Sequence, residues 1–259
     1  MPDDAQVEER LTGGNVSVVV RVGDTVRRPA QPWTPAVHRL LDHLETVGFT
    51  HAPRAHGLDD AGREILDYLP GRMGGFPYDP WLLTDAGLDA VIGSIRAFHD
   101  ATAGSPLLDE SGWQAMVPDD LPREVICHGD LAPYNLVLRD GRGDYDDPSD
   151  IAGWIDFDTA CPGPRLWDLA YAAYTFVPLY TEGHDLPDDL DRAARLTRFA
   201  ETAAVERGEL LAMIDCRLST HITWLEDGAA SGDPARVRMR AEGHAAMYRR
   251  ERIALDGWR

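Results

Sequence analysis

The sequence contains a loop of polar residues between two apolar runs, Val125-Ile126-Cys127-His128-Gly129-Asp130-Leu131-Ala132-Pro133-Tyr134-Asn135-Leu136-Val137-Leu138. A second short apolar run leads into Trp154-Ile155-Asp156-Phe157-Asp158. Pro133 prevents the first loop from continuing as a regular helix or strand ladder. Because functional side chains concentrate on such loops, we expect Asp130, Asn135 and Asp156 to converge on one spot.

These three side chains have the chemistry that phosphoryl transfer needs. A carboxylate orients and deprotonates an attacking hydroxyl, and hard oxygen ligands hold Mg²⁺ beside nucleotide phosphates. The spacing Asp130-x-x-x-x-Asn135 matches the catalytic loop of kinases. A single aspartate in a turn is more often a turn former or a cap, so the interpretation depends on the three residues occurring together.

Three motifs follow one another in the chain: His128-Gly129-Asp130-x-x-x-x-Asn135, Ile155-Asp156-Phe157-Asp158 and Pro162-Gly163-Pro164-Arg165-Leu166-Trp167-Asp168-Leu169-Ala170. In these motifs the chain resembles the aminoglycoside phosphotransferase family, the small-molecule branch of the kinase-like fold. The resemblance implies an α+β, bilobal protein-kinase-like fold. Residues 1–68 would form a nucleotide-binding lobe of antiparallel sheet and one helix. Residues 69–259 would form a larger, mainly helical catalytic and acceptor-binding lobe, with the hinge at about 67–71.

The resemblance also implies a role for each motif residue. Asp130 would be the catalytic base, and Asn135 and Asp156 the magnesium ligands. Asp168 would be a buried carboxylate that braces the catalytic loop, and His128 would support that loop rather than react. ATP and Mg²⁺ are the implied cofactors, and the motifs leave the choice between ATP and GTP open.

The nucleotide-binding residues are predicted from the resemblance alone. The turn containing Gly13-Gly14 would cover the phosphates. The family places a basic residue on the third strand, and all 25 basic residues of this chain are arginine. Arg27 is the first choice and Arg28 the second, because neighbouring residues point to opposite faces of a strand. The segment Asp67-Tyr68-Leu69-Pro70-Gly71 resembles the interlobe hinge, with Asp67 and Leu69 at the adenine.

One expected residue has no clear counterpart. The pair Thr34-Pro35 predicts a helix to about Val47, with Thr34 as its N-cap. In the resembled family this helix carries a glutamate paired with the basic residue of the third strand. Val37 or His38 stands at that position here, so the sequence leaves open which residue replaces the glutamate.

Helical periodicity continues through the second half of the chain. It predicts helices over about 82–103, 166–179, 186–207, 209–227 and 234–254. In the resembled family, acidic side chains on the last helices shape the acceptor site, and Asp215, Glu226 and Asp227 are the candidates. Ion pairing on a solvated helix face explains these residues equally well.

Composition excludes some classes of partner. A net charge of -19 argues against nucleic acid, and it is compatible with either simple solubility or a cationic ligand. The longest apolar run, 166–180, contains Asp168 and is too short to cross a membrane. Three widely spaced cysteines and an acidic N-terminus without an apolar core predict a cytoplasmic protein with reduced thiols. The oligomeric state is not readable from these features.

The predicted function is ATP-dependent O-phosphorylation of a small-molecule hydroxyl acceptor, an aminoglycoside or another antibiotic, in resistance or self-protection. The alternative is a catalytically weak or inactive kinase-like binding or immunity protein, because lysine is missing and the helix glutamate has no clear counterpart. A protein-directed kinase is disfavoured, since no Ala-Pro-Glu follows Asp156.

Overall fold

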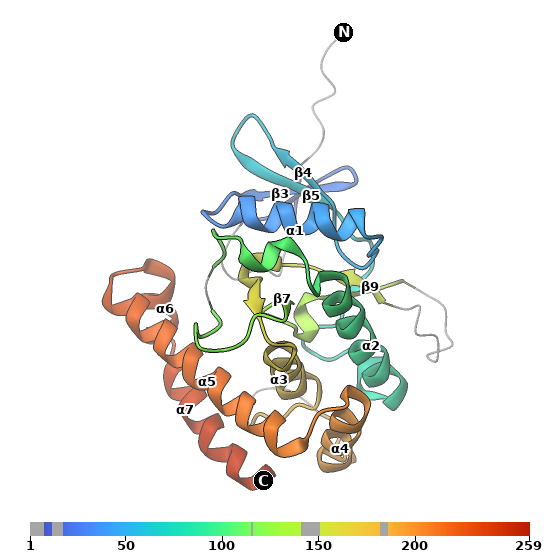
Figure 1. Ribbon diagram of the computed structural model, residues 1–259, viewed down its shortest axis with the longest axis vertical. Coiled ribbons are helices and arrows are strands. Elements are labelled where there is room, and N and C mark those ends of the chain that lie inside the picture. Colours follow the sequence, from blue (N-terminus) through green and yellow to red (C-terminus); the bar gives the residue numbers. More distant parts are fainter. Residues whose placement is uncertain (1–7, 12–17, 115, 141–150, 182–185) are drawn as a thin grey trace.

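The computed structural model describes residues 8–11, 18–114, 116–140, 151–181 and 186–259. The predicted Gly13-Gly14 phosphate turn and the acidic segment 141–150 lie outside these residues. The N-terminal part is an antiparallel sheet with one helix beside it, and the larger part below it is mainly helical (Figure 1). The α+β, kinase-like architecture predicted from the sequence is therefore confirmed.

The N-terminal sheet consists of antiparallel neighbours in the order β1 (Glu8–Arg10), β2 (Val20–Val22), β3 (Thr25–Pro29), β5 (Arg63–Asp67) and β4 (Ala55–Leu58). Helix α1 (Thr34–Thr46) runs along this sheet (Figure 1). Its buried stripe contains Val37, Leu40, Leu41 and Leu44. The N-cap is Trp33 rather than Thr34, because the Thr34 hydroxyl turns back to accept the Gln31 N–H at 2.9 Å.

Short strands in the larger part carry the motif loops. Strand β6 (Arg72–Met73) pairs with β8 (Leu136–Leu138), which pairs with β9 (Ile151–Trp154). Strand β7 (Val125–Cys127) pairs with β10 (Cys161–Gly163). The chain leaves the first sheet at Asp67 and enters the second at Arg72. The residues between the two sheets belong to the segment that the sequence predicts as the hinge. The catalytic stretch thus runs from β7 through a loop into β8, as its apolar flanks predict.

Six helices complete the described part of this lobe: α2 (Asp85–Thr102), α3 (Arg165–Phe176), α4 (Arg192–Ala203), α5 (Arg207–Ala230), α6 (Pro234–Ala241) and α7 (His244–Ala254). Helix α4 begins later than predicted, because the Asp191 side chain caps it by accepting the N–H groups of Ala193 and Ala194. The single helix predicted over 234–254 is two helices, because Gly243 adopts a left-handed φ of +88° between them. None of the helices in the described residues combines the length and the apolar character that a membrane span requires.

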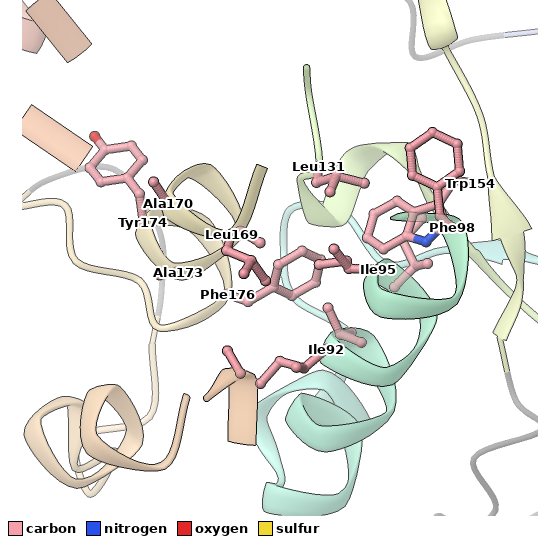
Figure 2. Packing of buried hydrophobic residues seen from close by; sticks show 14 of the residues in the cluster. Ile92, Ile95, Phe98, Leu131, Trp154, Leu169, Ala170, Ala173, Tyr174 and Phe176 are labelled. Carbon is pink, nitrogen blue, oxygen red and sulfur yellow. The ribbon is translucent and has the colours of Figure 1, made fainter. Parts of the chain in front are cut away.

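The core of this lobe lies between α2 and α3, beneath the catalytic loop. Ile92 and Ile95 project from α2 toward Phe176 of α3, and Phe98 of α2 lies beside Trp154 of β9 (Figure 2). Leu131 of the catalytic loop lies above the two isoleucines (Figure 2). Each of these six labelled side chains is at most 1% exposed. Close packing of this kind is rigid, so the loop is built on a fixed base.

Candidate active site

The conformation of the catalytic loop depends on Gly129. Its φ is +84°, and a Cβ at this position would lie 2.3 Å from the carbonyl oxygen of Thr159. Only glycine fits both the left-handed conformation and the close approach. A 3-10 turn over Pro133–Asn135 then returns the chain to β8, with the proline in the first position, where its missing N–H has no cost.

Asp130 and Asn135 meet in this loop. The Asp130 Oδ2 accepts a hydrogen bond from Asn135 Nδ2 at 2.8 Å, and the Asp130 Oδ1 accepts one from the Tyr134 hydroxyl at 2.8 Å. Burial raises the pKa of Asp130 to about 6 against the opposing hydrogen bond from Tyr134, and the nearby Asp156 carboxylate adds to the rise. A carboxylate with this pKa is ionised at neutral pH and basic enough to take a proton.

Asp168 braces the loop from behind. It is 0% exposed, and it accepts the backbone N–H groups of His128 at 2.7 Å and Gly129 at 2.9 Å. His99 of α2 donates its Nε2–H to the same carboxylate at 3.0 Å. Burial alone would raise the pKa of Asp168, but the hydrogen bond and charge of His99 hold it below its ordinary value. The carboxylate therefore stays ionised and fixes the loop backbone.

His128 also has a structural role. Its Nε2–H donates to the Ile155 carbonyl at 3.1 Å, and its Nδ1 accepts the Asp130 N–H at 3.2 Å. Burial lowers the pKa of His128, so the ring is neutral and provides one donor and one acceptor. It connects the Asp130 loop to the end of β9.

Asp156 lies where β9 ends. Its backbone is left-handed, with φ 66° and ψ 60°, which is uncommon for a residue other than glycine and is concentrated at functional sites. The preceding Ile155 N–H donates to the Asn135 carbonyl at 2.9 Å, so Asp156 and Asn135 are held by neighbouring backbone. The Asp156 side chain is 48% exposed.

Arg28 connects the N-terminal sheet to this site. One Nη lies 2.8 Å from Asp156 Oδ1, the other 2.5 Å from Asp158 Oδ1, and Nε 2.5 Å from Glu64 Oε1. Burial opposes the charge of Arg28, but the carboxylates of Asp158, Asp156 and Glu64 raise its pKa above the ordinary value. The guanidinium is therefore fully charged and surrounded by acid groups.

Arg27, the first choice from the sequence, lies elsewhere. Its Nη1 donates to the Thr25 hydroxyl at 2.6 Å, and its Nε is 4.0 Å from Asp59. The alternation of side chains along β3 sends only one of the two arginines toward Asp156, and the register of β3 with β5 makes that residue Arg28. Arg28, the second choice from the sequence, is thus the arginine that contacts Asp156, and the assignment of either arginine to the nucleotide phosphates stays a prediction.

The oxygen atoms of Asn135 and Asp156 suit a hard cation. The Asn135 amide nitrogen faces Asp130, which turns its oxygen to the other side. One amide and one carboxylate oxygen match the preference of Mg²⁺, which keeps several waters and also binds substrate phosphates. Among the described residues, no group of three or more His, Cys, Asp or Glu side chains is arranged to hold a metal ion. The donor set thus fits a metal bound together with a nucleotide, rather than a closed structural metal site.

The two hinge residues differ in their contacts. The Asp67 carboxylate lies 2.7 Å from His56 Nε2 and accepts the Arg54 N–H at 3.2 Å, so it belongs to the N-terminal sheet. Tyr68 donates its N–H to the Asp24 carbonyl at 2.9 Å. Within the described residues, the backbone N–H and C=O of Leu69 form no such hydrogen bond. The Leu69 backbone thus differs from that of Tyr68, which is bonded to the N-terminal sheet.

Two of the three acidic candidates for acceptor binding are engaged in ion pairs. Asp215 accepts two hydrogen bonds from Arg252, at 2.8 and 3.0 Å, and Glu226 pairs with Arg249. Asp227 is exposed on α5. The ion pairs of Asp215 and Glu226 join α5 to α7, and they are not the pairs within one helix that the sequence suggested.

The structure adds residues that the sequence patterns missed: Glu64, Tyr134, His99 and Arg217. Arg217 of α5 donates to the carbonyl of Gly129 and lies over the Tyr171 ring at 4.4 Å. It is separated from that glycine by 88 positions. No local motif marks such a residue, because its role depends on packing between distant helices.

Two concave regions lie away from this site. One, of about 620 Å³, is lined by residues of α1 and α2 that include His43 and Asp100. The other, of about 710 Å³, includes Arg96 and Glu209. Neither is lined by Asp130, Asn135 or Asp156, so the chemistry of the side chains rather than cavity size identifies the candidate site.

The antiparallel N-terminal sheet and the mainly helical larger part together form the kinase-like fold. Residues 85–202 match the model of the family described as "Phosphotransferase enzyme family", APH, and the resemblance predicted from the motifs is thereby confirmed. The chain is 33% identical over 176 residues to a trifolitoxin immunity protein from Rhizobium leguminosarum bv. trifolii, covering 66% of this chain and 63% of that protein. It is 46% identical over 61 residues to a homoserine kinase from Zymomonas mobilis, covering 23% of this chain and 16% of that enzyme. The matches span less than two thirds of either curated relative.

Solved structures share the fold at low sequence identity. A Plasmodium vivax ethanolamine kinase superposes with a TM-score of 0.62 and 12% identity, covering 96% of this chain and 82% of that one. The GDP complex of aminoglycoside 2'-phosphotransferase-IIIa superposes with a TM-score of 0.61 and 16% identity, covering 98% of this chain and 95% of that one. An aminoglycoside phosphotransferase from Streptomyces rimosus, in complex with ADP and streptomycin, superposes with a TM-score of 0.56 and 17% identity, covering 82% of this chain and 91% of that one.

Proposed function

We propose that this protein is an ATP-dependent O-phosphotransferase that acts on a hydroxyl of a small molecule, an aminoglycoside or another antibiotic, in resistance or self-protection. The observation that carries the proposal is the Asp130 carboxylate. Asn135 orients it, and burial together with the nearby Asp156 carboxylate raises its pKa to about 6. Phosphoryl transfer depends on positioning and charge neutralisation more than on covalent chemistry, and this arrangement can provide both.

Asp130 would act on the acceptor. The Tyr134 hydroxyl already donates to Asp130 Oδ1, and this is the contact that a substrate hydroxyl makes with a general base. An acceptor hydroxyl that replaces Tyr134 at this oxygen would be oriented and would lose its proton to Asp130. The bond from the acceptor oxygen to the γ-phosphorus forms as the bond to the β,γ-bridging oxygen breaks, and ADP leaves.

The nucleotide would lie between the two lobes, 1–68 and 69–259. Leu69 and the adjoining Asp67 would place the adenine at the hinge, and Arg28 would neutralise phosphate charge in place of a lysine. Asn135 and Asp156 would hold Mg²⁺, which shields the phosphate oxygens when bound. Because the motifs leave the choice between ATP and GTP open, GTP is tested beside ATP.

The nature of the acceptor is proposed from the relatives. An immunity protein among them supports a role in protection from a toxic small molecule, and kinases of homoserine and ethanolamine widen the panel to other hydroxyl compounds. Because Asp215 and Glu226 are neutralised by their own arginines, a polycationic acceptor would have to rely on other groups. We also propose a cytoplasmic location, on the basis of three free cysteines.

The test is ADP release from Mg-ATP or Mg-GTP across aminoglycosides, nucleoside and peptide antibiotics, sugars, homoserine and choline, followed by mass analysis of the acceptor. We expect one class to gain a phosphate with the wild type and none with Asp130→Ala. Phosphorylation of the same acceptor by Asp130→Ala at a near-normal rate would overturn the assignment of the base.

The second candidate is a kinase-like immunity protein that binds its ligand without turnover. The contact of Arg28 with Asp156 favours it, because this arginine occupies a carboxylate that a kinase needs for its metal. Calorimetric binding of a panel member, with no ADP release and no modified product, would establish this alternative.

A further inference from the structure

One of the three carboxylates that surround Arg28 is buried in the N-terminal sheet. Glu64 is 1% exposed, and it stands directly opposite Arg28 in the register of β3 and β5. Buried carboxylates are stable only when they are paired and hydrogen-bonded. Both oxygens of Glu64 meet this requirement, since Oε1 lies 2.5 Å from Arg28 Nε and Oε2 lies 3.1 Å from His38 Nε2.

His38 comes from α1, so three elements meet at Glu64. His38 is one of the two residues, with Val37, that stand where the resembled family has its helix glutamate. In this chain the acid group is on strand β5, and the helix contributes a histidine that orients it. The ion pair to the basic residue of β3 is kept, with its two partners on neighbouring strands.

The position of Arg28 shows what such a pair can do. Its Nε is bound to Glu64, while its two Nη groups are bound to Asp156 and Asp158. Glu64, Asp156 and Asp158 carry three negative charges, and Arg28 neutralises one of them. A guanidinium held only by Asp156 and Asp158 would compete fully with a divalent cation for Asp156, because charge-assisted hydrogen bonds are among the strongest in proteins.

We propose that Glu64, oriented by His38, is the positioning residue of Arg28, and that it shares the arginine's charge so that Asp156 stays available to Mg²⁺ and nucleotide. This inference rests on the proposed nucleotide-binding function. Glu64 retains Arg28 beside Asp156 through Nε, and the two Nη groups would turn from Asp156 and Asp158 to phosphate oxygens.

The test is calorimetric binding of ADP over a series of Mg²⁺ concentrations, which needs no turnover. In Glu64→Gln the acceptor oxygen for Arg28 is kept but the charge is lost, so Arg28 should bind Asp156 and Asp158 more tightly. We expect the half-saturating Mg²⁺ concentration to rise roughly fivefold or more, with ADP affinity restored by excess Mg²⁺. A purely structural defect would not be restored by metal.

Glu110→Gln is the matched control. Glu110 pairs with Arg39 of α1 in an exposed ion pair, so the same substitution should leave the Mg²⁺ dependence unchanged. His38→Leu, which removes only the orienting contact, should shift the Mg²⁺ dependence in the same direction by a smaller factor. It also serves as the deciding variant if Glu64→Gln does not fold.

The outcomes separate the two proposals. If the wild type binds Mg-ADP and folded Glu64→Gln and His38→Leu both bind it with wild-type Mg²⁺ dependence, the role of Glu64 is wrong and the proposed function stands. If the wild type itself does not bind Mg-nucleotide, the proposed function fails, and this inference fails with it.

Discussion

The guanidinium of Arg28 in β3 lies 2.8 Å from the carboxylate of Asp156 at the end of β9, although the two residues are 128 positions apart. This contact ties the N-terminal sheet to the loop that follows the catalytic segment. The same arginine contacts Asp158 and the buried Glu64. One side chain thus connects the sheet to the group of carboxylates that gives the site its chemistry.

The raised pKa of Asp130 makes a prediction for acceptor turnover. Because the base must be ionised, kcat/KM for the acceptor should fall about tenfold per pH unit below about pH 6. The hydrogen bond from Tyr134 lowers this pKa, so Tyr134→Phe should move the acid limb to higher pH. The measurement is a pH profile of initial rates. If the acid limb lay at the same pH in both proteins, the Tyr134 hydrogen bond would not be setting the pKa of the catalytic base.

Asp130→Asn should lose activity and gain stability. The carboxyl has an ordinary pKa of 3.8 and a folded pKa of about 6, so ionisation in the folded state is unfavourable. The cost develops as the pH rises from about 4 to about 6 and is complete above that, on the order of 3 kcal/mol. The variant should therefore be inactive, bind nucleotide normally, and unfold at a higher Tm than the wild type at pH 7.5. At pH 4 the difference in Tm should largely vanish, and a gain that is independent of pH would contradict the assigned cause.

Asp168→Asn should destabilise the fold. The carboxylate accepts three N–H groups in a fully buried place, and an amide would present its own NH₂ to at least one of them. We expect the free energy of unfolding to fall by about 2–4 kcal/mol, measured by urea denaturation. Asp100→Asn is the control, because Asp100 is 72% exposed in its ion pair with Arg165 and should change stability by less than about 0.5 kcal/mol. Equal effects of the two substitutions would argue against the bracing role.

Gly129→Ala tests the geometry of the catalytic loop. Gly129 and Gly104 both have positive φ, at +84° and +67°, but of the two only Gly129 has another atom within 4 Å of the place a Cβ would occupy, the Thr159 carbonyl. Gly104→Ala should cost roughly 1 kcal/mol of conformational strain and leave activity intact. Gly129→Ala should lose both stability, by about 3 kcal/mol or more, and phosphate transfer. If Gly129→Ala and Gly104→Ala lowered the free energy of unfolding equally, the close contact with the Thr159 carbonyl would not be the reason that position 129 requires glycine.

The sequence predicts the parts of the site that are local and misses those that depend on distant packing. The spacing from Asp130 to Asn135 and the apolar flanks identify the β7-loop-β8 unit, because turn chemistry and strand patterning act over a few residues. The face of β3 could not be assigned in the same way: the choice between Arg27 and Arg28 depends on the register with β5. Glu64 was not identified because a glutamate in a strand is common, and its burial becomes evident only when α1 brings His38 against it. The break at Gly243 was missed because a single glycine inside a helical pattern is compatible with one continuous helix.

The most direct test of this account is calorimetric titration of the purified protein with ADP in the presence and absence of Mg²⁺, for the wild type, Asp130→Ala and Asp156→Ala. We predict that the wild type and Asp130→Ala bind ADP in a Mg²⁺-dependent way and that Asp156→Ala loses this dependence. A wild type that does not bind nucleotide, or an Asp156→Ala variant whose binding responds to Mg²⁺ as the wild type does, would contradict the claim that Asp130, Asn135 and Asp156 form one phosphate-transfer site.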